Sequence, residues 1–163
     1  MRFKNWIMFV AVSAGLTGCA SLQETMTLPT VGPDTPGNSF MNVGQLMVYS
    51  ATISGDSRLI WHHPHTSYTI YDADGQKLRL VMNHVGIDDP VPSLETLHAG
   101  QYAVVAQSDV YGKVRVPVAI QGGRLTRVFL ERGGMPKSDR ENRTNFVTFP
   151  NGDVIGIRAD LKK

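Results

Sequence analysis

The stretch Leu97-His98-Ala99-Gly100-Gln101-Tyr102 decides the fold that this sequence predicts, together with the alternating segment at 103–106 that follows it. Glycine lacks a Cβ, so Gly100 lets the chain turn a corner between two sheets. A tyrosine two residues later can pack into such a corner and bond through its hydroxyl to backbone upstream. The pattern therefore predicts a structural corner formed by Leu97, Gly100 and Tyr102.

Short alternating segments with turn residues between them lie on both sides of this corner. Beyond the N-terminal region, no window of the sequence shows a helical period. Pro117 cannot donate to a β-ladder, so its strand is expected at a sheet edge or with a bulge. About seven short strands predict an all-β fold of the sandwich type. The expected strands are 45–53, 58–62, 67–71, 78–82, 101–107, 114–120 and 125–131.

The corner motif resembles a signature of bacterial surface domains. Together with the strand at 103–106 and Tyr111-Gly112, it is similar to the L-x-P-G-x-Y-x-V…G-Y pattern of the carboxypeptidase regulatory-like, transthyretin-like and PEGA-type families. Ala99 stands where those families usually have proline. The resemblance covers residues 45–131. It implies an Ig-like or prealbumin-like β-sandwich without catalytic residues.

The N-terminus has the pattern of a secretory signal. Two basic residues, Arg2 and Lys4, precede an apolar stretch at 6–16, which is shorter than the roughly 20 residues that span a bilayer. The run Leu16-Thr17-Gly18-Cys19 then resembles the lipobox of bacterial lipoproteins. This resemblance implies a signal peptide at 1–18, cleavage between Gly18 and Cys19, an S-diacylglyceryl group on Cys19 and acylation of its new amino group.

The lipobox also implies a location. In Gram-negative lipoproteins, an aspartate after the cysteine favours the inner membrane, and Ala20 stands there in this sequence. An outer-membrane lipid anchor facing the periplasm is therefore expected in such a host. Without the signal, 14 basic residues balance 14 acidic ones, so the mature charge gives no reason to expect a nucleic-acid partner. Cys19 is the only cysteine, which excludes an internal disulfide.

The two flanking regions are expected to differ from the sandwich at 45–131. Residues 19–44 contain prolines, glycines and small polar residues without a period, which predicts a lipidated, disordered tether. Residues 132–163 combine a polar linker with a β-hairpin around Asn151-Gly152. Because an isolated hairpin is marginal in water, it must dock on its own sandwich, on a partner or on a second copy.

Three histidines form the main candidate for site chemistry. His62, His63 and His65 surround Pro64 and could bind a metal with Asp88 and Asp89. A polar strand end is the alternative interpretation. The aromatic side chains that could stack on a glycan, or pack in the core instead, are Trp61, Tyr68, Tyr71 and Tyr111.

Enzymatic activity and a bound cofactor are not expected, since no catalytic motif occurs and the acids Asp88, Asp89 and Glu95 are typical of a solvated loop. The sequence predicts a lipid-anchored cell-envelope protein that acts as a non-enzymatic binding or structural module. Its expected partners are the membrane, through the lipid, and an envelope protein or glycan. A glycan- or peptidoglycan-binding module and a periplasmic metal binder are the alternatives.

Overall fold

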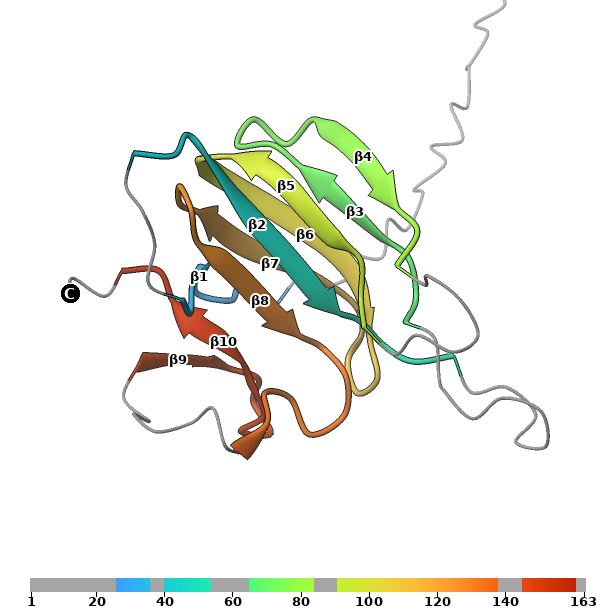
Figure 1. Cartoon of the computed structure of the whole chain (residues 1–163). Helices are drawn as coiled ribbons and strands as arrows, with labels where there is room; N and C mark the ends of the chain where they lie inside the picture. The colour runs from blue at the N-terminus through green and yellow to red at the C-terminus, as the bar shows by residue number, and fades with distance from the viewer. Residues whose placement is uncertain (1–25, 36–39, 54–64, 84–90, 138–144, 161–163) are drawn as a thin grey trace, which may run out of the picture.

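Two facing β-sheets form the fold in this computed structural model, which describes residues 26–35, 40–53, 65–83, 91–137 and 145–160 (Figure 1). A seven-stranded sheet has the order β4-β3-β6-β7-β1-β10-β9, and a three-stranded sheet the order β5-β2-β8. The predicted all-β fold is confirmed, and the paired sheets agree with a sandwich. The strands are β1 (Val31–Gly32), β2 (Val43–Tyr49), β3 (Tyr68–Tyr71), β4 (Lys77–Val81), β5 (Leu94–His98), β6 (Gly100–Ser108), β7 (Gly112–Ile120), β8 (Leu125–Phe129), β9 (Phe146–Thr148) and β10 (Val154–Arg158).

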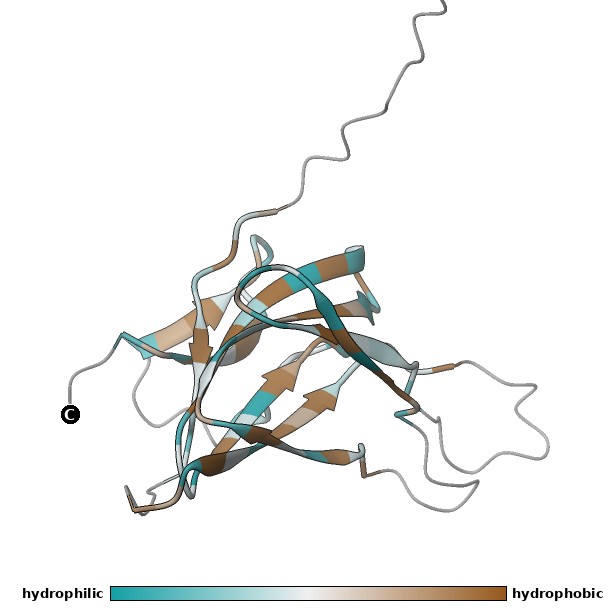
Figure 2. Cartoon of the chain, turned by 90° about the horizontal axis from the view of Figure 1, so that it is seen from above, coloured by the Kyte–Doolittle hydropathy of each residue, from teal (hydrophilic) through white to brown (hydrophobic). Residues whose placement is uncertain are grey.

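The core lies between the sheets because apolar and polar residues alternate along the strands (Figure 2). In β7, Val114, Val116 and Val118 are buried, whereas Lys113 and Arg115 are exposed. Side chains point alternately to the two faces of a strand, so this pattern fixes which face of β7 looks inward. The largest fully buried side chains are Tyr68, Phe129, Leu46, Ile70 and Leu130.

The position of β7 corrects the expectation for Pro117. This residue pairs with Ala103 in an unbroken register that runs from Gly100–Ile120 to Ser108–Gly112. β7 also lies between β6 and β1, so it is not an edge strand. The proline is tolerated there because β1 pairs with β7 only at Val118. Little of the ladder on that side of β7 is available for Pro117 to interrupt.

The N-terminal segment differs from the predicted tether. Residues 26–35 belong to the fold, with Leu28 and Val31 buried in the core. Val31 pairs in parallel with Val118 and antiparallel with Arg158. A strand of two residues has no periodicity to detect, which is why the sequence indicated a tether as far as residue 44. The described fold begins at Met26.

The C-terminal hairpin closes the protein's own sheet. β9 and β10 flank a turn in which Gly152 has a φ of 86° and Phe149 N donates to Asp153 O. β10 then pairs with β1. Of the three docking alternatives, the structure shows the first, so residues 145–158 form one sandwich with the strands before them.

The structure contains a further strand that the sequence did not predict. β5 was not predicted from the sequence, yet Leu94–His98 pairs along its whole length with β2, from Val43–His98 to Met47–Leu94. Only Leu97 of this strand is fully buried, so its alternation is weak. The strand expected at 58–62 lies outside the described residues.

Close backbone packing at Gly44 generates a stability prediction. A Cβ at this position would lie 2.2 Å from Gln121 O, a backbone atom that cannot turn away. At Gly100 the nearest atom to a Cβ is the Tyr102 ring, at an ordinary 3.5 Å. We expect Gly44→Ala to lower the free energy of unfolding in urea by about 1–3 kcal/mol or more. The control Gly100→Ala should lose nothing, and equal stability of the two variants would contradict this packing.

Candidate functional site

The predicted corner lies where the chain passes from one sheet to the other. β5 ends at His98 in the three-stranded sheet, and β6 begins at Gly100 in the seven-stranded sheet. The Tyr102 hydroxyl donates to His98 O at 3.0 Å, and Leu97 is buried. Gly100 is not among the glycines with positive φ. The geometry of this corner is that of a structural element, with Tyr102 bracing the crossing.

His65 is the one histidine of the candidate metal cluster that lies in the described chain, and it is buried. Its Nδ1 lies 2.6 Å from Ser50 O, which can only accept, so Nδ1 carries the proton. The Tyr49 ring meets the imidazole edge to face, with 5.7 Å between the ring centroids. These contacts make His65 a satisfied internal side chain.

Asn83 and Ser50 extend this buried polar network. Asn83 Nδ2 donates to Val48 O at 2.7 Å and to Ser50 Oγ at 2.9 Å. Ser50 Oγ in turn donates to Thr66 O at 2.6 Å, and Asn83 Oδ1 accepts from Ser93 N. The network joins β2 to the segments before β3 and before β5, and its role is to hold them together.

The remaining residues of the predicted sites fall in two groups. Gly18, Cys19, His62 and His63 lie outside the described residues, as do Trp61, Asp88 and Asp89. Within the described ranges, no three His, Cys, Asp or Glu side chains are grouped closely enough to hold a metal ion. The structure therefore does not bring His65 together with other described ligands.

Among the candidate aromatic side chains, Tyr71 alone lies on an outer sheet face in the described chain. Tyr68 is buried in the core. Tyr111 packs against Phe149 with ring centroids 4.6 Å apart, and its hydroxyl accepts from Asn151 N. The Arg115 guanidinium lies over the Tyr71 ring, 5.2 Å from the centroid.

The strand register assembles a basic surface around Tyr71. Thr69 of β3 lies opposite Val105 of β6, which lies opposite Arg115 of β7. One row away, Tyr71 pairs with Lys77 of β4. Lys113 lies opposite Gln107, also on the outer side. We call this surface the basic face, and it comprises Lys77, Lys113, Arg115 and Tyr71.

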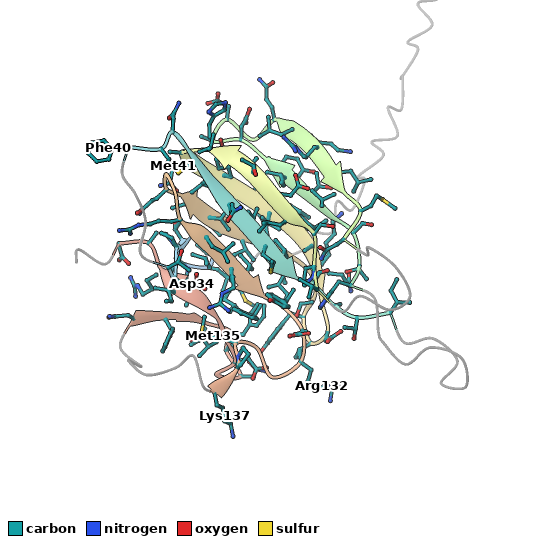
Figure 3. All side chains as sticks on the ribbon, viewed as in Figure 1. Asp34, Phe40, Met41, Arg132, Met135 and Lys137 are labelled. Atoms are coloured by element: carbon teal, nitrogen blue, oxygen red, sulfur yellow. The ribbon has the colours of Figure 1, made fainter. Side chains whose placement is uncertain are left out.

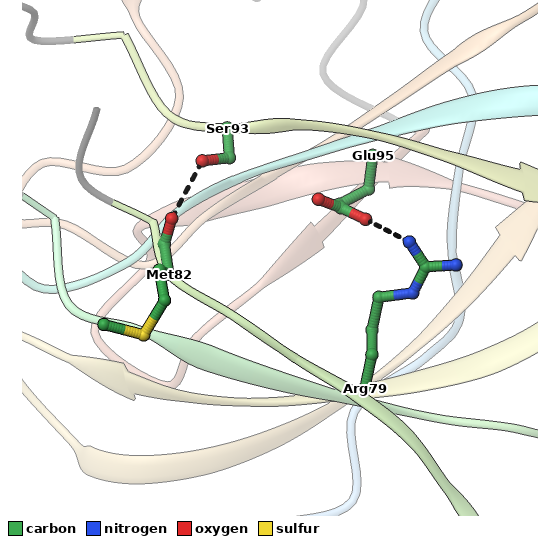
Figure 4. Close-up of polar contacts among 4 residues, drawn as sticks. All are labelled: Arg79, Met82, Ser93 and Glu95. Carbon is green, nitrogen blue, oxygen red and sulfur yellow. Dashed lines mark hydrogen bonds and ion pairs between the residues drawn. The ribbon is translucent and has the colours of Figure 1, made fainter.

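β4 borders the basic face as the end strand of the seven-stranded sheet, with β3 as its one strand neighbour in the described chain. A bulge at Leu78 separates the pairs Ile70–Arg79 and Tyr71–Lys77. Arg79 forms an ion pair with Glu95 of β5 at 2.8 Å, and Ser93 Oγ donates to Met82 O at 3.0 Å (Figure 4). The first contact joins β4 to β5 of the opposite sheet, and the second joins the residue after β4 to the residue before β5. Three apolar side chains stay exposed along β4: Leu78, Leu80 and Met82.

The outer side of β8 in the three-stranded sheet is occupied by contacts within the chain. The carboxylate of Asp34, labelled in Figure 3, forms an ion pair with Arg127 Nε. Arg127 lies over the Phe129 ring, on which Tyr49 stacks with centroids 4.6 Å apart. Burial raises the pKa of the Tyr49 hydroxyl, and the Arg127 charge opposes this rise. These side chains are committed to packing the N-terminal segment onto β8.

Comparison with known proteins adds no assignment to this geometry. No family model, curated protein or solved structure matches the chain. Among the residues that the structure describes, no helix is long and apolar enough to cross a membrane.

Sequence reasoning did not single out the basic face. Lys113 and Arg115 alternate with buried valines, so their common face could be deduced from the sequence of β7. Their proximity to Lys77 and Tyr71 could not, because it depends on how β4, β3, β6 and β7 pair. The sequence of β7 thus indicates that two of the cations share a face, and the strand register is needed to place the third.

The buried Asn83 amide is expected to contribute more to the stability of the fold than the Ser93 hydroxyl, whose hydrogen bond to Met82 O is exposed. Asn83→Ala leaves Val48 O, Ser50 Oγ and Ser93 N without this partner, and unsatisfied buried groups destabilise by about 1–3 kcal/mol each. We expect a loss of about 2–3 kcal/mol in urea unfolding. Ser93→Ala, which removes an exposed bond, should lose less than about 1 kcal/mol. Comparable losses in the two variants would show that Asn83 is not the centre of the network.

Glu131 gives the fold a pH dependence of defined sign. Burial raises the pKa of its carboxyl group, His65 opposes the rise and Asp109 adds to it. A raised acid pKa stabilises the fold below the unfolded value, and this stability is lost as pH rises through the folded value. We expect the stability difference between Glu131→Gln and wild type to grow in favour of the variant from about pH 4 to pH 7. A difference in urea midpoint that stays constant with pH would contradict this.

Proposed function

We propose that the protein is a lipid-anchored component of the bacterial cell envelope, a non-enzymatic module that binds or braces other envelope components. In a Gram-negative host, the anchor lies in the outer membrane and the sandwich in the periplasm. The main support is the lipobox-like run Leu16-Thr17-Gly18-Cys19, and the described fold begins a few residues after it. Met26 packs against the core and is the seventh residue after Cys19. Seven residues of fully extended chain reach at most about 25 Å. A lipid on Cys19 therefore keeps the whole sandwich next to the membrane surface.

The use of the buried polar groups supports a binding or structural role. His65, Ser50 and Asn83 are engaged in the network that ties β2 to neighbouring segments. Ser108 Oγ accepts from Val110 N and Tyr111 N, and Thr126 Oγ1 donates to Ala119 O. Each of these side chains serves the fold. What the described chain offers to a partner lies on its surface, on the basic face and along β4.

Metabolic labelling with a palmitate analogue tests the anchor. We expect the wild-type protein to take up the label and to fractionate with membranes. Cys19→Ala should lose the label, because the thiol is the one group in the chain that can form the thioether. Gly18→Ala serves as the matched control, since a small residue before the cysteine is retained. Equal labelling of wild type and Cys19→Ala, or no label in either, would overturn the proposal.

A further inference from the structure

Exposed positive charge gathers on the outer side of the seven-stranded sheet. Its four adjacent strands β4, β3, β6 and β7 contain four lysine and arginine residues and no aspartate or glutamate. Three of these cations, Lys77, Lys113 and Arg115, are exposed on the basic face. The nearest acids in the sequence lie in the turns between these strands. Asp72 and Asp74 lie in the β3–β4 turn, where the Asp72 carboxylate accepts from Gln76 N, and Asp109 lies in the β6–β7 turn, where its carboxylate accepts from Thr52 N and Arg132 N. The chain from Cys19 onward is neutral overall, with 14 charges of each sign, so this sheet face is a local excess of positive charge.

Exposed apolar side chains border the cations. Leu78, Leu80 and Met82 are 47%, 54% and 58% exposed. Leu80 lies opposite Thr69, which is in register with Arg115 through Val105, so Leu80 points to the same side of the sheet as the cations. Arg79, one residue earlier, points to the other side and pairs with Glu95. Cations next to exposed leucine and methionine form the kind of surface that lies in a membrane interface.

The anchored end of the chain approaches from this same side. Pro29 and Thr30 line a groove together with Gln101 of β6. Gln101 lies opposite Ala119 and two residues from Ala103, which places it on the outer side of the seven-stranded sheet. Figure 2 likewise shows the described chain beginning behind this sheet, away from β2, β5 and β8. A lipid on Cys19, within about 25 Å of Met26, would therefore turn the basic face toward the bilayer.

We propose that the basic face docks on the anionic phospholipid headgroups of the leaflet that holds the lipid anchor. The docking rests on the proposed anchor, which keeps the face within reach of the surface. Each lysine or arginine close to an anionic leaflet strengthens binding by roughly fivefold at low salt, and the effect fades within a Debye length. Three cations are too few for firm binding from solution, but a tether raises their effective concentration at the membrane. Leu80 and its neighbours at the edge of the face then enter the headgroup region.

Lysine accessibility in the lipidated protein tests this docking. The full-length mature lipoprotein is reconstituted into vesicles of phosphatidylcholine alone, or with phosphatidylglycerol added, and treated with a water-soluble amine reagent. We expect Lys77 and Lys113 to react at least fivefold more slowly in the anionic vesicles than in detergent. Lys137, exposed beyond β8 (Figure 3), is the internal control and should react at the same rate in both. Protection should vanish in phosphatidylcholine and at high salt.

Charge-reversal variants make the test specific. The pair Lys113→Glu with Arg115→Glu should reduce the protection of Lys77 to less than twofold. The matched pair Arg132→Glu with Lys137→Glu, on another part of the surface (Figure 3), should leave it unchanged. Urea midpoints confirm that both proteins are folded. Equal labelling of all lysines in anionic vesicles, or equal protection in neutral ones, would overturn the docking and leave the anchor standing. Failure of the protein to enter any vesicle would overturn the anchor itself.

Discussion

The pairing of a two-residue strand with both of its neighbours holds this sandwich together. β1 joins β7 on one side through Val31–Val118 and β10 on the other through Val31–Arg158 and Gly32–Ile157. Without it, the hairpin of β9 and β10 has no strand to continue the large sheet in the described chain. The packing is close. A Cβ at Gly156 would lie 2.5 Å from Val31 Cγ1, so β10 fits against β1 only with glycine there. The N-terminal segment that was expected to be a spacer is a structural strand.

The sequence predicted the parts of this fold that are local. Strands β6, β7 and β8 alternate clearly, and Asn151-Gly152 marks the turn of the last hairpin. The sequence could not predict β1, because a strand of two residues shows no period and is held by pairing partners far along the chain. β5 was missed for a related reason, since most of its side chains face solvent. Pairing partners, unlike strand propensity, are a property of the whole chain.

The basic face likewise arises from strand pairing and not from any one strand. The chain from Cys19 onward is neutral overall. Lys77, Lys113 and Arg115 nevertheless share a sheet face whose strands contain no aspartate or glutamate. Alternation within β7 indicates that two of these cations share a face. Only the register across β4, β3, β6 and β7 brings in the third, Lys77, together with Tyr71 and Leu80. The positive charge of this face is therefore a product of strand pairing.

Because β1 lies between β7 and β10, its pairing also constrains the order in which the strands can fold during synthesis. β1 pairs with β10, the last strand of the described chain. Native pairing on that side of β1 is therefore impossible until Arg158 has been made and released. Before that point β6 and β7 can form their local hairpin, but the sheet stays open between β7 and the missing β10. Closure of a contact over so much of the chain is slow relative to hairpin formation. A polypeptide of this topology therefore remains incompletely folded while it is still emerging, the condition in which a chain can be threaded through a narrow translocation channel.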